Sequence, residues 1–138
     1  MHRNEDTMKL VIGGFAQGKR SYILENDDVS YAVFDKTLPS EQEVQTAEQR
    51  GQKILIDHLH LWIREELKLG KMPEEGLFAF TAENPDCTVL CDEIGNGIVP
   101  MEAFEREYRE RTGRILIELA KRAEEVVRVL CGIGQRIK

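Results

Sequence analysis

A glycine-rich segment near the N-terminus restricts the possible folds of this chain more than any other part of its sequence. Met8 to Ile12 (MKLVI) is a short apolar run that predicts a buried strand, and residues 19–25 are compatible with a helix. Between them lies Gly13-Gly14-Phe15-Ala16-Gln17-Gly18-Lys19, which matches the pattern G-x-x-x-x-G-K. A strand, a glycine turn and a helix in this order are the context that a phosphate-binding loop requires.

This loop predicts a binding site for a polyphosphate. Glycines let the backbone N–H groups turn inward around phosphate oxygens, and the start of the following helix adds a partial positive charge. Lys19 would reach the terminal phosphates as a point charge. We therefore expect residues 13–21 to bind ATP or GTP; the alternative is a glycine-rich turn that binds no ligand.

The residue after the lysine departs from the pattern. A Ser or Thr is expected there, because its hydroxyl ligates Mg²⁺, but this chain has Arg20, with Ser21 one place later. One helical step rotates a side chain by about 100°, so Ser21 cannot simply take over the role. Arg20 could contact phosphate itself or obstruct the metal site, and the sequence leaves both possibilities open.

Carboxylates follow two further apolar runs. Asp57 comes after Ile54-Leu55-Ile56, and Asp92-Glu93 come after Val89-Leu90-Cys91. Ligands bind α/β sheets at the carboxyl ends of the strands, where such acids orient Mg²⁺ or accept the proton of a substrate hydroxyl. We expect Asp57 to be a Mg²⁺ ligand and Lys19, Asp92 and Glu93 to be catalytic. Capping of the following turn or helix is the alternative for each carboxylate.

Strand and helix patterns alternate along the chain. Further strands are expected at 30–34, 54–57, 88–91 and 126–131, and further helices at 58–67, 73–82 and 101–125. Ser40, with Glu43 three residues later, predicts a capping box at the start of another helix. One long helix over 40–69, broken at Gly51, is an alternative to the strand at 54–57. The pattern predicts an α/β fold with a mostly parallel sheet and helices on both faces.

Length and composition limit the architecture and the partners. The 138 residues suit one domain, with 1–7 as a disordered N-terminal extension and 8–138 as the folded nucleotide-binding domain. A net charge of −6 without an obvious basic face argues against nucleic acid, and no apolar run is long enough to span a membrane. The three cysteines support neither a disulfide framework nor a zinc site, so we expect buried thiols at Cys91 and Cys131 and a cytoplasmic protein.

The two central histidines are expected to be structural. His58 and His60 flank Leu59. Residues two apart on a helix point to different sides, which argues against a shared metal site. We expect both to be partly buried or surface residues, not catalytic ones.

The C-terminal half resembles the adenosylcobinamide kinase / adenosylcobinamide-phosphate guanylyltransferase family. Asp92-Glu93-Ile94-Gly95-Asn96-Gly97-Ile98-Val99-Pro100 is similar to the family's N-E-V-G-x-G-I-V-P, and Gly113-Arg114, Leu119-Ala120 and Gly132-Ile133-Gly134 follow in the family's order. The loop at 13–19 is similar to the family's G-G-x-x-S-G-K-S. Glu93 matches the motif glutamate, Asp92 replaces its usual asparagine, and Asp57 falls where the family carries an acid after a strand.

The resemblance implies a RecA-like P-loop fold, often assembled as a homotrimer. It implies a nucleotide-dependent kinase that phosphorylates the aminopropanol hydroxyl of the corrinoid adenosylcobinamide. Family members then attach GMP through a guanylylated histidine. In the family, that histidine normally lies on a helix within a stretch of a few dozen residues that precedes the segment around Asp57. This chain lacks that stretch. We therefore expect the guanylyltransferase step to be absent, and a non-catalytic paralogue that binds nucleotide or corrinoid and assembles with a full-length relative is the alternative.

Overall fold

A computed structural model of the chain describes residues 8–94 and 102–138, and its centre is a six-stranded sheet. Five strands are parallel, and the last one is antiparallel to its neighbour. The spatial order is β2-β3-β4-β1-β5-β6. The strands are β1 (Lys9–Gly13), β2 (Tyr31–Asp35), β3 (Lys53–Asp57), β4 (Thr88–Asp92), β5 (Glu125–Leu130) and β6 (Ile133–Arg136).

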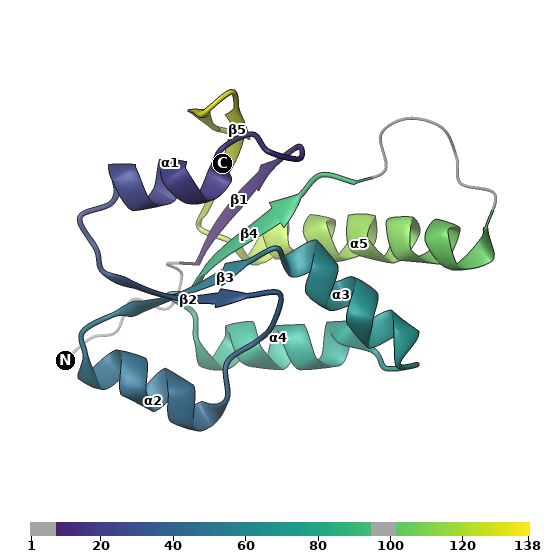
Figure 1. Cartoon of the computed structure of the whole chain (residues 1–138), viewed down its shortest axis with the longest axis horizontal. Helices are drawn as coiled ribbons and strands as arrows, with labels where there is room; N and C mark the ends of the chain where they lie inside the picture. The colour runs from purple at the N-terminus through teal and green to yellow at the C-terminus, as the bar shows by residue number, and fades with distance from the viewer. Residues whose placement is uncertain (1–7, 95–101) are drawn as a thin grey trace.

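Helices cover the two faces of the sheet unequally (Figure 1). Among the described helices, only α1 packs against one face, through Ile23, in a small core. The opposite face packs against the other four helices and holds the larger core. The helices are α1 (Lys19–Asn26), α2 (Glu41–Gln49), α3 (Leu59–Lys68), α4 (Pro73–Glu83) and α5 (Ala103–Arg122). The predicted α/β class, mostly parallel sheet and helices on both faces are confirmed.

The segment around β3 shows why its sequence is ambiguous. Leu55 enters the small core and its neighbours Ile54 and Ile56 enter the large one, because successive strand residues point to opposite faces. A parallel strand that is buried on both faces is apolar throughout, so it spreads over a helical wheel. The strand-then-helix prediction is confirmed, and the alternative of one long helix is wrong.

The predicted capping box at the start of α2 is confirmed. The Glu43 backbone N–H donates to the Ser40 hydroxyl at 3.2 Å, and the Ser40 backbone N–H donates to a Glu43 carboxylate oxygen at 2.9 Å. Two of the backbone donors at this helix start are thereby satisfied by side chains. The local sequence alone fixes where α2 begins.

The C-terminal end differs from the sequence prediction. Residues Ile133–Arg136 form β6, which pairs with β5 through the two-residue turn Cys131-Gly132, with φ of 51° and 75°. Positive φ at both positions is typical of the type I′ hairpin turn. Cys131 is therefore exposed at a turn, and its expected burial is wrong, whereas Cys91 and Cys87 are buried.

Three further sequence predictions concern the end of α5, two segments outside the described residues, and membrane spans. The helix predicted to reach residue 125 ends at Arg122, because Ala123 is extended with ψ of 140° and leads into β5. The predicted extension at 1–7 and most of the glycine-rich turn after Asp92 lie outside the described residues. Within the described residues, no helix is both long and apolar enough to cross a membrane.

Candidate functional site

The loop between β1 and α1 is shaped by glycines at its two ends. A Cβ on Gly13 would lie 2.6 Å from the backbone oxygen of Val129 on the neighbouring strand, so no larger residue fits without a shift. Gly18 precedes the first residue of α1 with φ of 87°, a conformation that glycine adopts without strain. The strand, loop and helix therefore follow one another as the sequence predicts.

Lys19 is the first residue of α1, and its side chain folds back over this loop. Its ammonium donates to the carbonyl oxygen of Gly14 at 2.9 Å and lies 2.6 Å from Oδ1 of Asp92. Lys19 is only 8% exposed. A buried ammonium needs a paired carboxylate, and Asp92 at the end of β4 supplies it. The register of the sheet explains the contact, because Asp92 lies directly beside Gly13.

Besides Lys19, the side chain of His60 also contacts Asp92. The Asp92 backbone N–H donates to Nδ1 of His60 at 3.1 Å, and Nε2 of the same ring lies 3.3 Å from Oδ2 of Asp92. Since Nδ1 accepts, Nε2 carries the proton of the neutral ring and faces the carboxylate. Burial lowers the pKa of His60 below its ordinary value, which favours this neutral form.

His60 is itself fixed by the helices behind it. The Tyr108 hydroxyl on α5 donates to the His60 backbone carbonyl at 2.9 Å. His60 is 6% exposed, so the expectation of a partly buried or surface residue is wrong for it. A histidine three places after a strand-end carboxylate is the only sequence signal for its role, and its partner Asp92 is 32 residues away.

A second carboxylate centre lies at the ends of β3 and β2. Nε of Arg20 donates to Oδ2 of Asp57 at 2.6 Å, and Nη2 of Arg20 lies 4.0 Å from Oδ1 of Asp35. Asp35 and Asp57 pair in register, which brings both carboxylates to one edge of the sheet. The sequence pattern placed Asp57 correctly but did not single out Asp35.

His58 joins this second centre. Its Nδ1 lies 2.5 Å from Oδ1 of Asp35, and its backbone N–H donates to Oδ1 of Asp57 at 2.8 Å. His58 precedes α3 in a left-handed conformation, with φ of 53°. For this reason the rings of His58 and His60 do not diverge as they would within one helix, and their centroids lie 5.8 Å apart.

These two centres and the loop border one pocket of about 500 Å³, which we call the β1–α1 pocket. Its lining contains most of the predicted nucleotide-binding residues together with three carboxylates: Phe15, Ala16, Gln17, Gly18, Lys19, Arg20, Ser21, Asp35, Asp57, His58 and Asp92. Gly13 and Gly14 are not among the lining residues. Glu93 is not either, since its carboxylate pairs with Arg128 of β5 at 3.1 Å.

Three groups in this pocket are placed to surround a cation. One ligand atom each from Asp35, Asp57 and His58 lies within 4.8 Å of the others. Mg²⁺ prefers oxygen ligands and near-octahedral geometry. The hydroxyl expected after Lys19 is absent, and the guanidinium of Arg20 already bonds to Asp57. In this arrangement the residues do not fit a Mg²⁺ site of the kind that the loop pattern implies.

The loop is also tied to the C-terminal hairpin. The Gly132 N–H donates to the Gln17 backbone carbonyl at 2.8 Å, and the Cys131 N–H donates to the Gln17 side-chain oxygen at 2.7 Å. This contact spans 114 residues and involves the turn that the sequence prediction missed. The turn of the C-terminal hairpin therefore fixes the position of the loop through two hydrogen bonds to Gln17, and we call this contact the brace.

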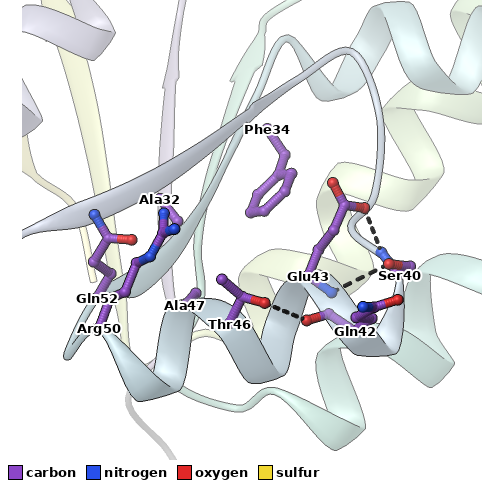
Figure 2. Close-up of a pocket in the computed structure, with 9 residues that line it drawn as sticks. All are labelled: Ala32, Phe34, Ser40, Gln42, Glu43, Thr46, Ala47, Arg50 and Gln52. Carbon is purple, nitrogen blue, oxygen red and sulfur yellow. Dashed lines mark hydrogen bonds between the residues drawn. The ribbon is translucent and has the colours of Figure 1, made fainter.

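A second pocket, of about 350 Å³, lies between the edge strand β2 and α2 (Figure 2). Figure 2 shows its lining residues, and among them Ser40 and Glu43 bond to each other in the capping box. Thr46 donates to the Gln42 carbonyl within the same helix at 2.9 Å. These polar groups hold α2 together, and none of the predicted site residues lines this pocket, so the β1–α1 pocket is the better functional candidate.

Comparisons with known proteins point to one family. The family profile described as cobinamide kinase / cobinamide phosphate guanyltransferase matches residues 25–137, which begin after the glycine loop. The bifunctional adenosylcobalamin biosynthesis protein CobU of Escherichia coli (strain K12) is 42% identical over 50 residues, which cover 36% of this chain and 28% of that protein. The CobU protein of Salmonella typhimurium (strain LT2) matches with the same identity and coverage.

Among solved structures, the crystal structure of the DnaC helicase loader is similar in chain path. It covers 93% of this chain and 82% of its own, with a TM-score of 0.44 and 11% sequence identity.

Proposed function

Because this chain belongs to the cobinamide kinase / cobinamide phosphate guanyltransferase family, we propose that it acts in cobalamin biosynthesis by binding a nucleoside triphosphate in the β1–α1 pocket. The observation that carries the proposal is Lys19, a buried ammonium at the start of α1 beside the glycine loop. A charge placed at the N-terminus of a helix, above backbone N–H groups, is suited to a polyphosphate.

The reaction that we propose is phosphorylation of the aminopropanol hydroxyl of a corrinoid. The hydroxyl oxygen attacks the terminal phosphorus, the bond from that phosphorus to the bridging oxygen breaks, and the nucleoside diphosphate leaves. Phosphoryl transfer depends mainly on positioning and on stabilisation of negative charge. Lys19 would supply the positive charge that stabilises the phosphoryl group, and Asp92, which pairs with Lys19 in this structure, would accept the hydroxyl proton.

Other parts of the proposal rest on the family alone. The matched segment spans 28% of the length of each curated CobU relative, so the corrinoid substrate and assembly as a homotrimer remain proposals for this chain. We propose that the guanylyltransferase step is absent. A catalytic role for Glu93 also stays a prediction, and its pairing with Arg128 outside the β1–α1 pocket favours Asp92 over Glu93.

Calorimetric titration tests the binding step directly. Wild type and Lys19→Ala are titrated with ATP and with GTP, and Lys68→Ala serves as the matched control because Lys68 is an exposed lysine that pairs with Glu65 on α3. Loss of a hydrogen bond to a charged group is expected to weaken affinity about 10- to 100-fold in Lys19→Ala. Equal affinities in wild type and Lys19→Ala would remove the assignment of the pocket.

A second candidate function is a non-catalytic paralogue that binds nucleotide or corrinoid. The observation that favours it is the Arg20–Asp57 pair, which departs from the expected kinase loop. The two functions separate in an assay of phosphate transfer to adenosylcobinamide. A kinase turns the substrate over and loses that turnover in Asp92→Asn, whereas the paralogue binds nucleotide without turnover.

A further inference from the structure

Arg20, the second residue of α1, reaches a cluster of three groups that could together hold a cation. The guanidinium of Arg20 bonds to Asp57 at 2.6 Å and approaches Asp35 to 4.0 Å. Asp35, Asp57 and His58 are the groups in the described residues whose ligand atoms cluster closely enough to hold a metal ion. The positive charge that the structure puts beside them belongs to Arg20.

Asp57 has little capacity left for another partner. Its Oδ2 accepts from Arg20, its Oδ1 accepts from the His58 backbone N–H, and its side chain is only 5% exposed. A Mg²⁺ ion would have to displace the guanidinium and then find oxygen ligands in an octahedral arrangement. The hydroxyl that would follow Lys19 in a metal-binding loop is replaced by Arg20 itself.

Arg20 nevertheless remains available to a ligand. Its side chain is 43% exposed and lines the β1–α1 pocket next to Lys19. A guanidinium has five N–H donors in a planar fork, and the structure uses Nε for the short bond to Asp57. The terminal nitrogens suit the two oxygens of a phosphate group, which guanidinium groups bind in a bidentate manner.

We propose that Arg20 takes the place of the divalent cation, so that this chain binds the polyphosphate of a nucleotide through Lys19 and Arg20 without Mg²⁺. The inference rests on the proposed function, because it concerns how the β1–α1 pocket holds a nucleotide. By replacing the loop hydroxyl, Arg20 would place a positive charge of the protein itself beside the polyphosphate.

Calorimetry with and without metal tests the inference. Wild-type protein is titrated with ATP in excess EDTA and again in excess Mg²⁺, and the two dissociation constants are expected to agree within about threefold, which is about half of the 1.4 kcal/mol that a tenfold change represents. Arg20→Ser, which restores a loop hydroxyl and frees Asp57, is expected to lose about 10- to 100-fold in EDTA and to regain affinity with Mg²⁺. Arg114→Ser, at an exposed arginine on α5, is the matched control.

The outcomes separate the two claims. The inference would be overturned if wild type binds ATP at least tenfold more tightly in Mg²⁺ than in EDTA. If Lys19→Ala still weakens that binding, the proposed function stands. No binding in either condition would overturn the proposed function. The comparison of wild type with and without metal needs no variant, so it decides the inference even if Arg20→Ser melts below the working temperature.

Discussion

Two buried carboxylates, Asp92 at the end of β4 and Asp57 at the end of β3, each receive one basic side chain from the first turn of α1. Lys19 pairs with Asp92 and Arg20 pairs with Asp57. Consecutive helical residues point about 100° apart, which sends the two charges to different strand ends. The surroundings differ: Asp92 is backed by the buried ring of His60, whereas Arg20 is nearly half exposed.

The difference shows which half of the pocket is fixed and which half is adaptable. The Asp92 centre is anchored in the large core through His60 and Tyr108, so it holds Lys19 in one place. The Asp57 centre is bordered by two partly exposed side chains that line the pocket, His58 and Asp35. We infer that Lys19 is held in one position, whereas the side of the pocket around Arg20 and Asp57 can adjust.

Neutralising the two carboxylates in turn would test this difference most strongly. Asp92→Asn leaves the buried ammonium of Lys19 uncompensated, so the free energy of unfolding is expected to fall by about 3 kcal/mol. Asp57→Asn leaves a guanidinium that turns towards water, so the expected loss is about 1 kcal/mol or less. Urea denaturation of both variants measures the two losses, and equal losses would remove the distinction between the centres.

A close backbone contact at the end of β1 gives the next largest effect. Gly13→Ala places a Cβ 2.6 Å from the Val129 carbonyl oxygen, so the strands must shift, at an expected cost of about 1–3 kcal/mol. Gly14→Ala is the matched control, because its Cβ would meet only the flexible Gln17 side chain at 3.6 Å. Thermal unfolding compares them. A Gly13→Ala protein as stable as Gly14→Ala would show that this side of the pocket is not tightly built.

The pH dependence of stability should report the Asp92 centre through His60. Burial holds the pKa of folded His60 below the ordinary 6.5, so below that pH the unfolded chain takes up a proton that the folded chain does not. The free energy of unfolding is therefore expected to fall as pH drops below 6.5, by at most about 1.4 kcal/mol per pH unit for this group.

Denaturation curves between pH 5.5 and 7.5 provide the measurement, a window of roughly one unit on each side of an ordinary histidine pKa. His60→Gln should flatten the slope by the contribution of that one proton, and His58→Gln, which leaves His60 in place, should retain it. A His60→Gln protein with an unchanged slope would contradict the proposed tautomer and burial of the ring.

The smallest expected effect concerns the hairpin that braces the loop. Gln17→Ala removes the hydrogen bond from the Cys131 N–H in an exposed position, so the free energy of unfolding should fall by about 0.5–1 kcal/mol. Gln45→Ala, at an exposed glutamine on α2, is expected to stay within about 0.5 kcal/mol of wild type. Chemical denaturation measures both, and a Gln17→Ala value matching the control would mean that the brace contributes nothing.

Local sequence patterns predicted most of the fold. The apolar runs ending at Asp57 and Asp92 are strands, and Ser40 begins a helix with its capping box. The hairpin strand β6 was missed because three of its four residues are exposed and they lack a buried alternation. Only the turn at Gly132 signalled it, and a glycine near the C-terminus has many other uses.

Sequence patterns singled out some residues of the candidate site but none of its pairings. Lys19 and Asp57 carry local signals, a glycine loop and a strand end. The direction of Arg20 was left open, since nothing in the local sequence states which strand end α1 faces. Asp35 enters the site through its register with Asp57, and His60 enters through a contact with a strand 32 residues away. Such pairings depend on the order of strands in the sheet, which periodicity does not encode.

A crystal structure of the protein grown with ATP or GTP is the most direct test of the central claim, that the glycine loop and Lys19 accept a polyphosphate. The expected result is phosphate density in the β1–α1 pocket, with the Lys19 ammonium moved from Asp92 to a phosphate oxygen. An empty loop, with Lys19 still 2.6 Å from Asp92 at a saturating nucleotide concentration, would contradict it.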